Sequence, residues 1–172
     1  METRAERDIE DDADRKVIRD VVEYGWHVVA IPPEGETPGW LFSIGMYKTF
    51  GHPEIAVFGL EPRVAHWLIN EVGSRVKAGT TFCSDAIATG LLENVTCIFR
   101  PVLAKWYRPF FGTAIWYYMG VGFPMLQCIW PDHEENYPWD VAFRESWRWA
   151  QPLLFHDSPK DARVVELLAS ME

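Results

Sequence analysis

The chain has 172 residues, of which 48% are hydrophobic and 24% are charged, a balance typical of a globular protein. Its formal net charge of −9 argues against a nucleic-acid surface, because phosphate contacts need clustered lysine and arginine. The length predicts one domain spanning residues 1–172. Three isolated cysteines without a CxxC pair, and histidines without zinc spacing, favour reduced thiols in a cytoplasmic protein and predict no metal site.

The negative charge is concentrated at the N-terminus. Seven acidic residues fall within the first fourteen positions: Glu2, Glu6, Asp8, Glu10, Asp11, Asp12 and Asp14. We therefore expect residues 1–14 to be a mobile, solvated segment, and the net charge says little about a particular partner. This segment lacks the apolar core of a secretory signal, and no later apolar run has the length of a membrane span, so we expect no membrane partner.

The first half of the chain predicts a helix, three strands and a second helix. Residues 11–24 carry an apolar stripe at helical spacing and are followed by a glycine. Strands are predicted at residues 26–31, 40–46 and 54–59, and the first two are expected to pair as a hairpin. A long helix is expected to begin at Pro62, because apolar residues then recur every four positions.

The second half is mostly β in character. Strands are predicted at residues 94–103 and 125–130, whereas residues 112–118 fit either a strand or a helix. The intervening segments are irregular and aromatic, and a short helix is predicted at residues 159–168. This order of elements predicts an α+β fold, with a largely antiparallel sheet, one long packed helix and flanking terminal helices.

The first candidate site is His52-Pro53-Glu54, at the entrance of the strand predicted over residues 54–59. Pro53 restricts the backbone on both sides, so that an imidazole and a carboxylate are held stiffly. Such a pair suits general acid–base chemistry or a shared metal ion. The alternative is a turn in which His52 hydrogen-bonds the backbone.

The second candidate is Asp132, which follows the strand at residues 125–130 and Pro131. It is predicted to pair with His133, or with His52 across the fold, as acid and base or as ligands. The alternative is an Asx turn, in which the Asp132 carboxylate caps the loop that follows it.

Aromatic residues near this second segment suggest a binding surface. Trp130 and Trp139 are predicted to form an aromatic wall for a ligand, with Gln127 as its polar floor and Trp40 as a further anchor. The alternative is structural: Asp140 would cap a helical turn beneath which Trp139 packs.

The same segments resemble an uncharacterised, mainly bacterial family known as domain of unknown function 4262. The motifs that carry the resemblance are Gly25-Trp26-His27-Val28, Phe42-Ser43-Ile44-Gly45-Met46, Gly51-His52-Pro53-Glu54, Phe58-Gly59-Leu60, Leu126-Gln127, Trp130-Pro131-Asp132 and Pro138-Trp139-Asp140. They cover most of residues 20–155, and the second strand departs conservatively from the family's more frequent Tyr-Thr-Val-Gly-Leu. The resemblance implies no established activity, but it marks the His52/Glu54 and Asp132/Trp139 regions as site candidates.

These observations favour a cytoplasmic binding module that recognises a protein partner or a small ligand, an immunity-type role against a basic toxin being one version. Its surface would combine three aromatic anchors with three polar residues at the rim: Trp40, Trp130, Trp139, His52, Glu54 and Asp132. The alternative is a small hydrolytic or metal-assisted enzyme that uses the three rim residues. A third prediction is a binder of flavin or another cofactor. The proposed site requires that the segments around His52 and Asp132 meet in one pocket.

Overall fold

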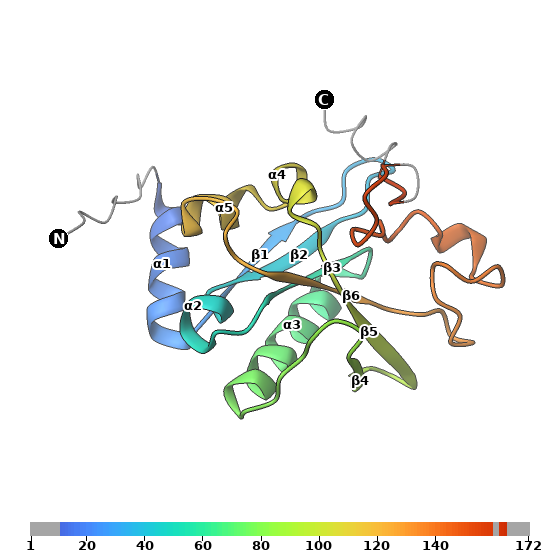
Figure 1. The fold of residues 1–172 in the computed structure, drawn as a ribbon, viewed down its shortest axis with the longest axis horizontal. Coiled ribbons are helices and arrows are strands. Elements are labelled where there is room, and N and C mark those ends of the chain that lie inside the picture. Colours follow the sequence, from blue (N-terminus) through green and yellow to red (C-terminus); the bar gives the residue numbers. More distant parts are fainter. Residues whose placement is uncertain (1–10, 160–161, 165–172) are drawn as a thin grey trace.

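A computed structural model describes residues 11–159 and 162–164, and Figure 1 shows a twisted sheet with helices on both faces. The strands of this part of the chain are β1 (His27–Ile31), β2 (Trp40–Ile44), β3 (Glu54–Phe58), β4 (Ile87–Leu92), β5 (Val95–Pro101) and β6 (Met125–Ile129). They form a 6-stranded sheet in the order β1-β2-β3-β6-β5-β4. Neighbouring strands are antiparallel except β3 and β6, which are parallel. The predicted α+β class with a largely antiparallel sheet is confirmed.

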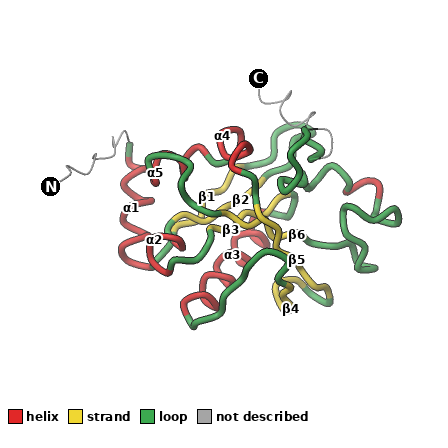
Figure 2. Tube along the Cα trace, in the orientation of Figure 1, coloured by secondary structure: helices red, strands yellow, loops and turns green. Residues whose placement is uncertain are grey.

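The helices divide between the two faces of the sheet. They are α1 (Asp12–Tyr24), α2 (Met46–Phe50), α3 (Pro62–Lys77), α4 (Tyr107–Phe110) and α5 (Gly112–Tyr118), with 3-10 turns at Ala104–Trp106 and Glu145–Trp147. Figure 2 shows α3 on one face, and α1, α4 and α5 on the other. None of the described helices has the length and apolar character that crossing a bilayer requires.

Each face of the sheet carries its own apolar core. In β2, Trp40 and Phe42 pack toward α4 and α5, whereas Leu41 between them packs toward α3. Successive side chains of a strand point to opposite faces, so a strand covered on both sides has no polar face. This explains why the sequences of β2, β3 and β6 are nearly continuous apolar runs.

The helix α3 begins and packs as its sequence predicts. Pro62 occupies its first turn, and the Glu61 carboxylate accepts hydrogen bonds from the backbone N–H groups of Arg63 and Val64. Its buried side chains follow the predicted spacing: Ala65, Leu68, Ile69, Val72 and Val76. The outer side of the helix therefore remains free to carry polar residues.

The helix α1 includes part of the segment expected to be mobile. The Asp11 side chain caps the helix by accepting a hydrogen bond from the backbone N–H of Asp14 at 2.9 Å. Residues 11–14 thus belong to this helix, and residues 1–10 lie outside the described part. At its other end Gly25 adopts a φ of 100°, a conformation that glycine tolerates, and turns the chain directly into β1.

Three further elements differ from the expectation or resolve it. The short helix α2 and the edge strand β4 were not predicted, since α2 spans little more than one turn and a glycine with positive φ interrupts β4. Residues 112–118, which fitted a strand or a helix, form α5. The helix predicted at residues 159–168 falls largely outside the described residues.

Candidate functional site

The two segments predicted to share one pocket lie at opposite ends of the sheet. The parallel register pairs Glu54 of β3 with Met125 of β6. Asp132 lies seven positions beyond Met125 (132 − 125 = 7), whereas His52 precedes Glu54. At about 3.3 Å per strand residue, the four steps from Met125 to Ile129 alone carry the chain about 13 Å away from the level of Glu54. His52 lies just before the start of β3, and Asp132 lies beyond the end of β6. Because the two strands are parallel, these residues are at opposite ends of the strand pair, and the prediction of a joint pocket is wrong.

His52 is buried, and both of its ring nitrogens are engaged. Nδ1 lies 2.8 Å from the carbonyl oxygen of Pro53, and Nε2 accepts a hydrogen bond from the backbone N–H of Phe82 at 2.9 Å. These partners hold the ring neutral, with its proton on Nδ1. Burial lowers the pKa of His52, in agreement with this state. His52 therefore fits the alternative in which its ring hydrogen-bonds the backbone of a turn.

Glu54 is fully buried and its carboxylate accepts five hydrogen bonds. The donors are Ser43 Oγ at 2.5 Å, the backbone N–H groups of Gly45 at 2.7 Å, Met46 at 3.3 Å and Tyr47 at 3.2 Å, and the Tyr118 hydroxyl. The three N–H groups belong to the start of α2, where Gly45 offers no side chain to cap them. Burial raises the pKa of Glu54, and the hydrogen bonds oppose this rise. The carboxylate serves as the missing cap of α2.

Asp132 forms the Asx turn given as its alternative. Its Oδ1 accepts hydrogen bonds from the backbone N–H groups of Glu134 and Asn136, each at 2.9 Å, and its Oδ2 accepts one from Arg144 N at 3.2 Å. Burial alone would raise the pKa of Asp132, but hydrogen bonds from Asn136, Glu134 and Arg144 outweigh it and lower that pKa. The side chain organises the loop that follows β6. Asp140 acts similarly, since it accepts from Tyr137 N at 2.7 Å instead of capping a turn at Val141.

The predicted aromatic wall is dispersed through the fold. The Trp40 indole N–H donates to the Phe110 carbonyl at 2.9 Å and that of Trp130 to the Phe58 carbonyl at 2.7 Å, and the two rings pack on opposite faces of the sheet. Gln127 is buried, where its amide bonds the backbone of residues 152 and 154. Trp139 stacks on Tyr137 at a ring-centroid distance of 5.2 Å. These four side chains do not line a common cavity.

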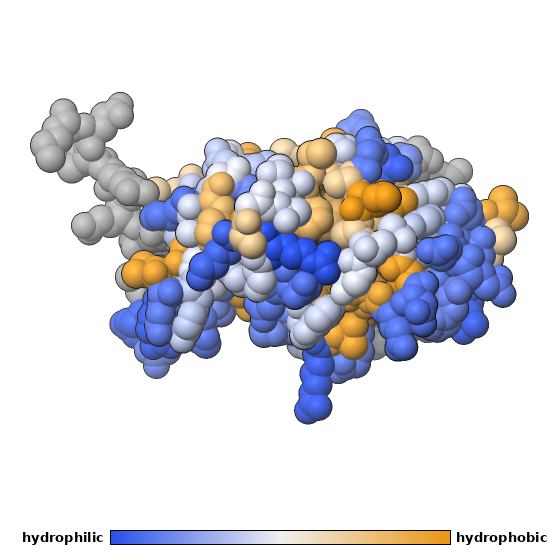
Figure 3. Space-filling view, turned by 90° about the horizontal axis from the view of Figure 1, so that it is seen from below, coloured by the Kyte–Doolittle hydropathy of each residue, from blue (hydrophilic) through white to orange (hydrophobic). Residues whose placement is uncertain are grey.

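A polar pocket of about 640 Å³ lies elsewhere, at the open edge of β1 between α1 and α3. We call it the α1–β1–α3 pocket. Its lining combines residues of these three elements and the turn between the first two: Lys16, Asp20, Glu23, Tyr24, Trp26, His27, Val28, His66, Asn70, Ser74 and Lys77. Figure 3 views the side of the molecule that carries α3 and shows polar residues interspersed with apolar ones there.

One wall of this pocket is an imidazole that is hydrogen-bonded to a carboxylate. The Asp20 carboxylate lies 2.7 Å from Nδ1 of His27 and 2.5 Å from Nζ of Lys16. Burial alone would raise the pKa of Asp20, but hydrogen bonds from Lys16 and His27 outweigh it and lower that pKa. Because a carboxylate accepts, Nδ1 of His27 carries a hydrogen, and in the neutral form of the ring Nε2 carries the lone pair. No residue in the described part of the chain hydrogen-bonds this Nε2.

The opposite wall fixes a second imidazole in the other tautomer. The Trp26 indole N–H is only a donor, so the Asn70 atom 2.9 Å away is the amide oxygen. The Asn70 NH₂ group then faces Nδ1 of His66 at 3.1 Å, and this nitrogen must accept. The hydrogen of His66 is therefore on Nε2, for which residues 11–159 and 162–164 provide no acceptor.

Local structure explains how these side chains come together. The turn at Gly25 brings Asp20 of α1 next to His27 of β1, and His66 and Asn70 lie one turn apart on α3. The Trp26 ring rests on Gly73 of α3, where a Cβ atom would lie 2.5 Å from Cζ2 of the ring. A glycine at this position thus allows the indole to reach Asn70.

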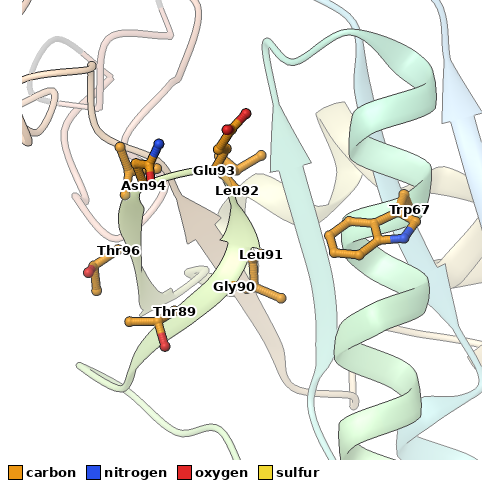
Figure 4. Close-up of a pocket in the computed structure, with 9 residues that line it drawn as sticks. Trp67, Thr89, Gly90, Leu91, Leu92, Glu93, Asn94 and Thr96 are labelled. Atoms are coloured by element: carbon orange, nitrogen blue, oxygen red, sulfur yellow. The ribbon is translucent and has the colours of Figure 1, made fainter.

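A second, largely apolar cavity of about 410 Å³ adjoins the first along α3. It shares His66 and Asn70 with the α1–β1–α3 pocket, and its remaining lining is Ala30, Leu41, Pro62, Arg63 and Trp67. We call it the Trp67 cavity. The Trp67 side chain, which is 52% exposed, also borders a third cavity of about 480 Å³. Figure 4 shows this third cavity between the Trp67 ring and the β4–β5 hairpin.

The sequence predictions missed the residues of the α1–β1–α3 pocket. As site candidates His27 and His66 were tested only for zinc spacing, although Trp26 and His27 stand in a motif that carries the family resemblance. Within the described ranges no group of three or more His, Cys, Asp or Glu residues is arranged to hold a metal ion. A signal for His66 and Asn70 exists, because they are four positions apart in a well-predicted helix. The Asp20–His27 pair gives no comparable signal, since its contact depends on the turn between helix and strand.

Comparison with known proteins yields one match. The family model described as "Domain of unknown function (DUF4262)" matches residues 20–144, which include Asp20, His27, His66 and Asn70. Neither a curated protein nor a solved structure matches the chain.

Proposed function

The chain belongs to the family described as Domain of unknown function (DUF4262), and from its geometry we propose that it binds a small polar molecule in the α1–β1–α3 pocket. The observation that carries this proposal is the pair of imidazoles held in opposite tautomers. Nε2 of His27 is left to accept a hydrogen bond, and Nε2–H of His66 is left to donate one. A concave site with a few fixed polar groups is the usual form of a small-ligand site.

The surroundings of both imidazoles support this proposal. Asp20 and Asn70 each hold one ring nitrogen, so that the rings are oriented before a ligand arrives. Lys16 and Lys77 balance the charges of Asp20 and Glu23 in the lining. The formal charge of the lining is therefore zero with neutral histidines, and recognition depends on hydrogen bonds more than on net charge.

The proposal keeps the predicted class of function, a binding module, and moves its site. The Trp40, Trp130 and Trp139 surface is not assembled in the fold, but the pocket contains a different tryptophan, Trp26. Recognition of a protein partner remains a prediction from the sequence, as does an immunity-type role against a basic toxin. Exposed apolar side chains that suit such a partner are Val64 and Trp67 of α3 and Ile87 of β4.

A small hydrolytic enzyme is the second candidate, and the Asp20–His27 contact favours it. With Nδ1 bonded to a carboxylate, Nε2 of His27 is oriented to act as a general base. It would take a proton from water as the water oxygen bonds to a substrate carbonyl carbon. The imidazolium would then return that proton to the leaving nitrogen or oxygen as its bond to carbon breaks. This role replaces the one predicted for His52, Glu54 and Asp132.

Two-dimensional ¹H–¹⁵N NMR tests the binding proposal, because the indole N–H of Trp26 reports on the pocket. Mixtures of small polar fragments are added to the full chain, and the indole signals are assigned by Trp→Phe variants. We expect a subset of fragments to shift the Trp26 indole signal in the wild type and in His133→Leu, but not in His27→Leu. His133 is the control because it is an exposed histidine outside the pocket lining. A fragment collection that never moves the Trp26 signal would contradict the proposal.

The second candidate is tested with the same samples. Hydrolysis of an ester or amide fragment, followed by the appearance of the free acid in one-dimensional spectra, is expected to stop in His27→Leu and to continue in His133→Leu. Equal rates in both variants would exclude His27 as the base.

A further inference from the structure

The α1–β1–α3 pocket and the Trp67 cavity are neighbours along α3 and together offer a two-part site. Both are lined by His66 and Asn70, so a molecule that contacts His66 from the polar side can extend over α3 into the apolar side. The apolar part is formed by Ala30 of β1, Leu41 of β2, and Pro62 and Trp67 of α3. A ligand that fills both parts must have a polar end and an apolar end.

The apolar end of the site centres on an indole that the fold leaves uncovered. Trp67 is 52% exposed, although α3 buries the neighbouring Leu68 and Ile69 completely. A large aromatic surface beside a cavity is a favourable contact for an aromatic ring or a branched aliphatic group. Burial of such a group strengthens a complex, because its apolar surface is removed from water.

The polar end favours a functional group that both donates and accepts a hydrogen bond. His27 presents an acceptor and His66 presents a donor. An ionised carboxylate has only acceptors, and an ammonium group has only donors, so each would leave one imidazole unsatisfied. An amide has an N–H and a C=O side by side, and it offers a partner to each imidazole.

We propose that the ligand of this site is a small uncharged amide that carries an aromatic or branched apolar group. Its N–H donates to Nε2 of His27, its carbonyl accepts from Nε2 of His66, and its apolar group lies on Trp67. This inference rests on the proposed function, because it specifies the occupant of the same pocket.

A matched series of probes separates the contributions of the two ends. Phenylacetamide has both features, acetamide lacks the ring, and phenylacetate lacks the N–H donor. Dissociation constants are measured on the full chain from the indole N–H signals of Trp26, which reports on the polar end, and Trp67, which reports on the apolar end. We expect phenylacetamide to shift both signals and to bind about tenfold or more tightly than either other probe.

Three variants assign the contacts. Trp67→Ala is expected to reduce phenylacetamide binding to the level of acetamide, and His66→Leu to abolish the preference for phenylacetamide over phenylacetate. His66→Gln restores a side-chain N–H donor and is expected to recover part of that preference. His133→Leu serves as the unaffected control.

The possible failures are distinguishable. Equal binding of phenylacetate and phenylacetamide overturns the amide assignment, and equal binding of acetamide and phenylacetamide overturns the role of Trp67. If polar fragments shift the Trp26 signal but phenylacetamide does not, this inference fails and the proposed function stands. If no fragment shifts the Trp26 signal, both fail.

Discussion

Two polar clusters of this protein contain similar side chains but differ in what their hydrogen bonds do. Around Glu54, a buried carboxylate meets five donors, and its hydrogen-bonding capacity is consumed within the fold. In the α1–β1–α3 pocket, Asp20 and Asn70 satisfy one nitrogen of each imidazole and leave the other available. A polar residue beside glycine or proline can thus be a cap for backbone N–H groups rather than a site residue. A binding site is indicated where side-chain donors or acceptors that face a cavity have no partner within the described fold.

The largest effect on stability is expected from a substitution in the Glu54 cluster, where all hydrogen bonds are formed within the fold. We predict that Glu54→Gln lowers the free energy of unfolding by about 3 kcal/mol, because a neutral amide cannot accept all five hydrogen bonds and leaves a buried N–H unpaired. Urea unfolding followed by circular dichroism measures the change. Glu71→Gln is the matched control, since Glu71 pairs with Arg75 at the surface and its loss is expected to cost about 0.5 kcal/mol or less. Similar stabilities of the two variants would show that Glu54 does not act as the cap of α2.

The second prediction concerns the support of the pocket. Gly73→Ala is expected to destabilise the protein by about 2 kcal/mol, because the new methyl group would meet the Trp26 ring at 2.5 Å. The displaced indole would lose its bond to Asn70, and the Trp26 indole signal would shift in NMR spectra. Gly112→Ala is the control, because that glycine begins α5, has an ordinary φ and has no neighbour within 4 Å of an added Cβ. An unchanged Trp26 signal in Gly73→Ala would contradict this view of the pocket wall.

The third prediction is a pH dependence of stability that involves His52. Burial lowers the pKa of His52 from its ordinary value of 6.5, so the folded protein resists protonation more than the unfolded chain does. The stabilisation by His52 is therefore complete above that value and is lost as the pH falls from about 7 to about 5. Glu54, whose pKa burial raises, contributes with the opposite sign.

Because the wild type and His52→Gln both retain Glu54, the difference between their unfolding free energies isolates the histidine. We expect this difference to shrink as the pH is lowered through that range. A difference that is constant from pH 7 to pH 5 would mean that His52 does not titrate with unfolding.

The smallest effect on stability is expected in the α1–β1–α3 pocket, where one nitrogen of each imidazole has no partner within the described fold. His66→Leu is predicted to change the free energy of unfolding by no more than about 0.5 kcal/mol, because the residue is exposed and is not among the buried residues of α3. The same change is expected to weaken ligand binding, as measured by the indole signals. A large loss of stability would place His66 with the structural cluster and remove the contrast between the two regions.

Much of the fold followed from local sequence patterns. Pro62 and the apolar spacing behind it located α3, and the continuous apolar runs located β2, β3 and β6 to within one or two residues. The Asx turn of Asp132 and the backbone bonding of His52 were among the alternatives, because a proline restricts the backbone near both residues. Such features depend on neighbours in the chain, so the sequence contains them.

The location of the candidate site was decided by tertiary structure alone. The crossover that makes β3 and β6 parallel separates His52 from Asp132, and the sequence of the two strands does not show in which direction they pair. Likewise, α1 and α3 lie on opposite faces of the sheet, and only their shared position at the edge of β1 brings His27 and His66 to one pocket. The amino-acid sequence therefore determined which elements form and which faces they bury. Packing between distant elements decided which polar atoms are hydrogen-bonded within the protein and which remain available to a ligand.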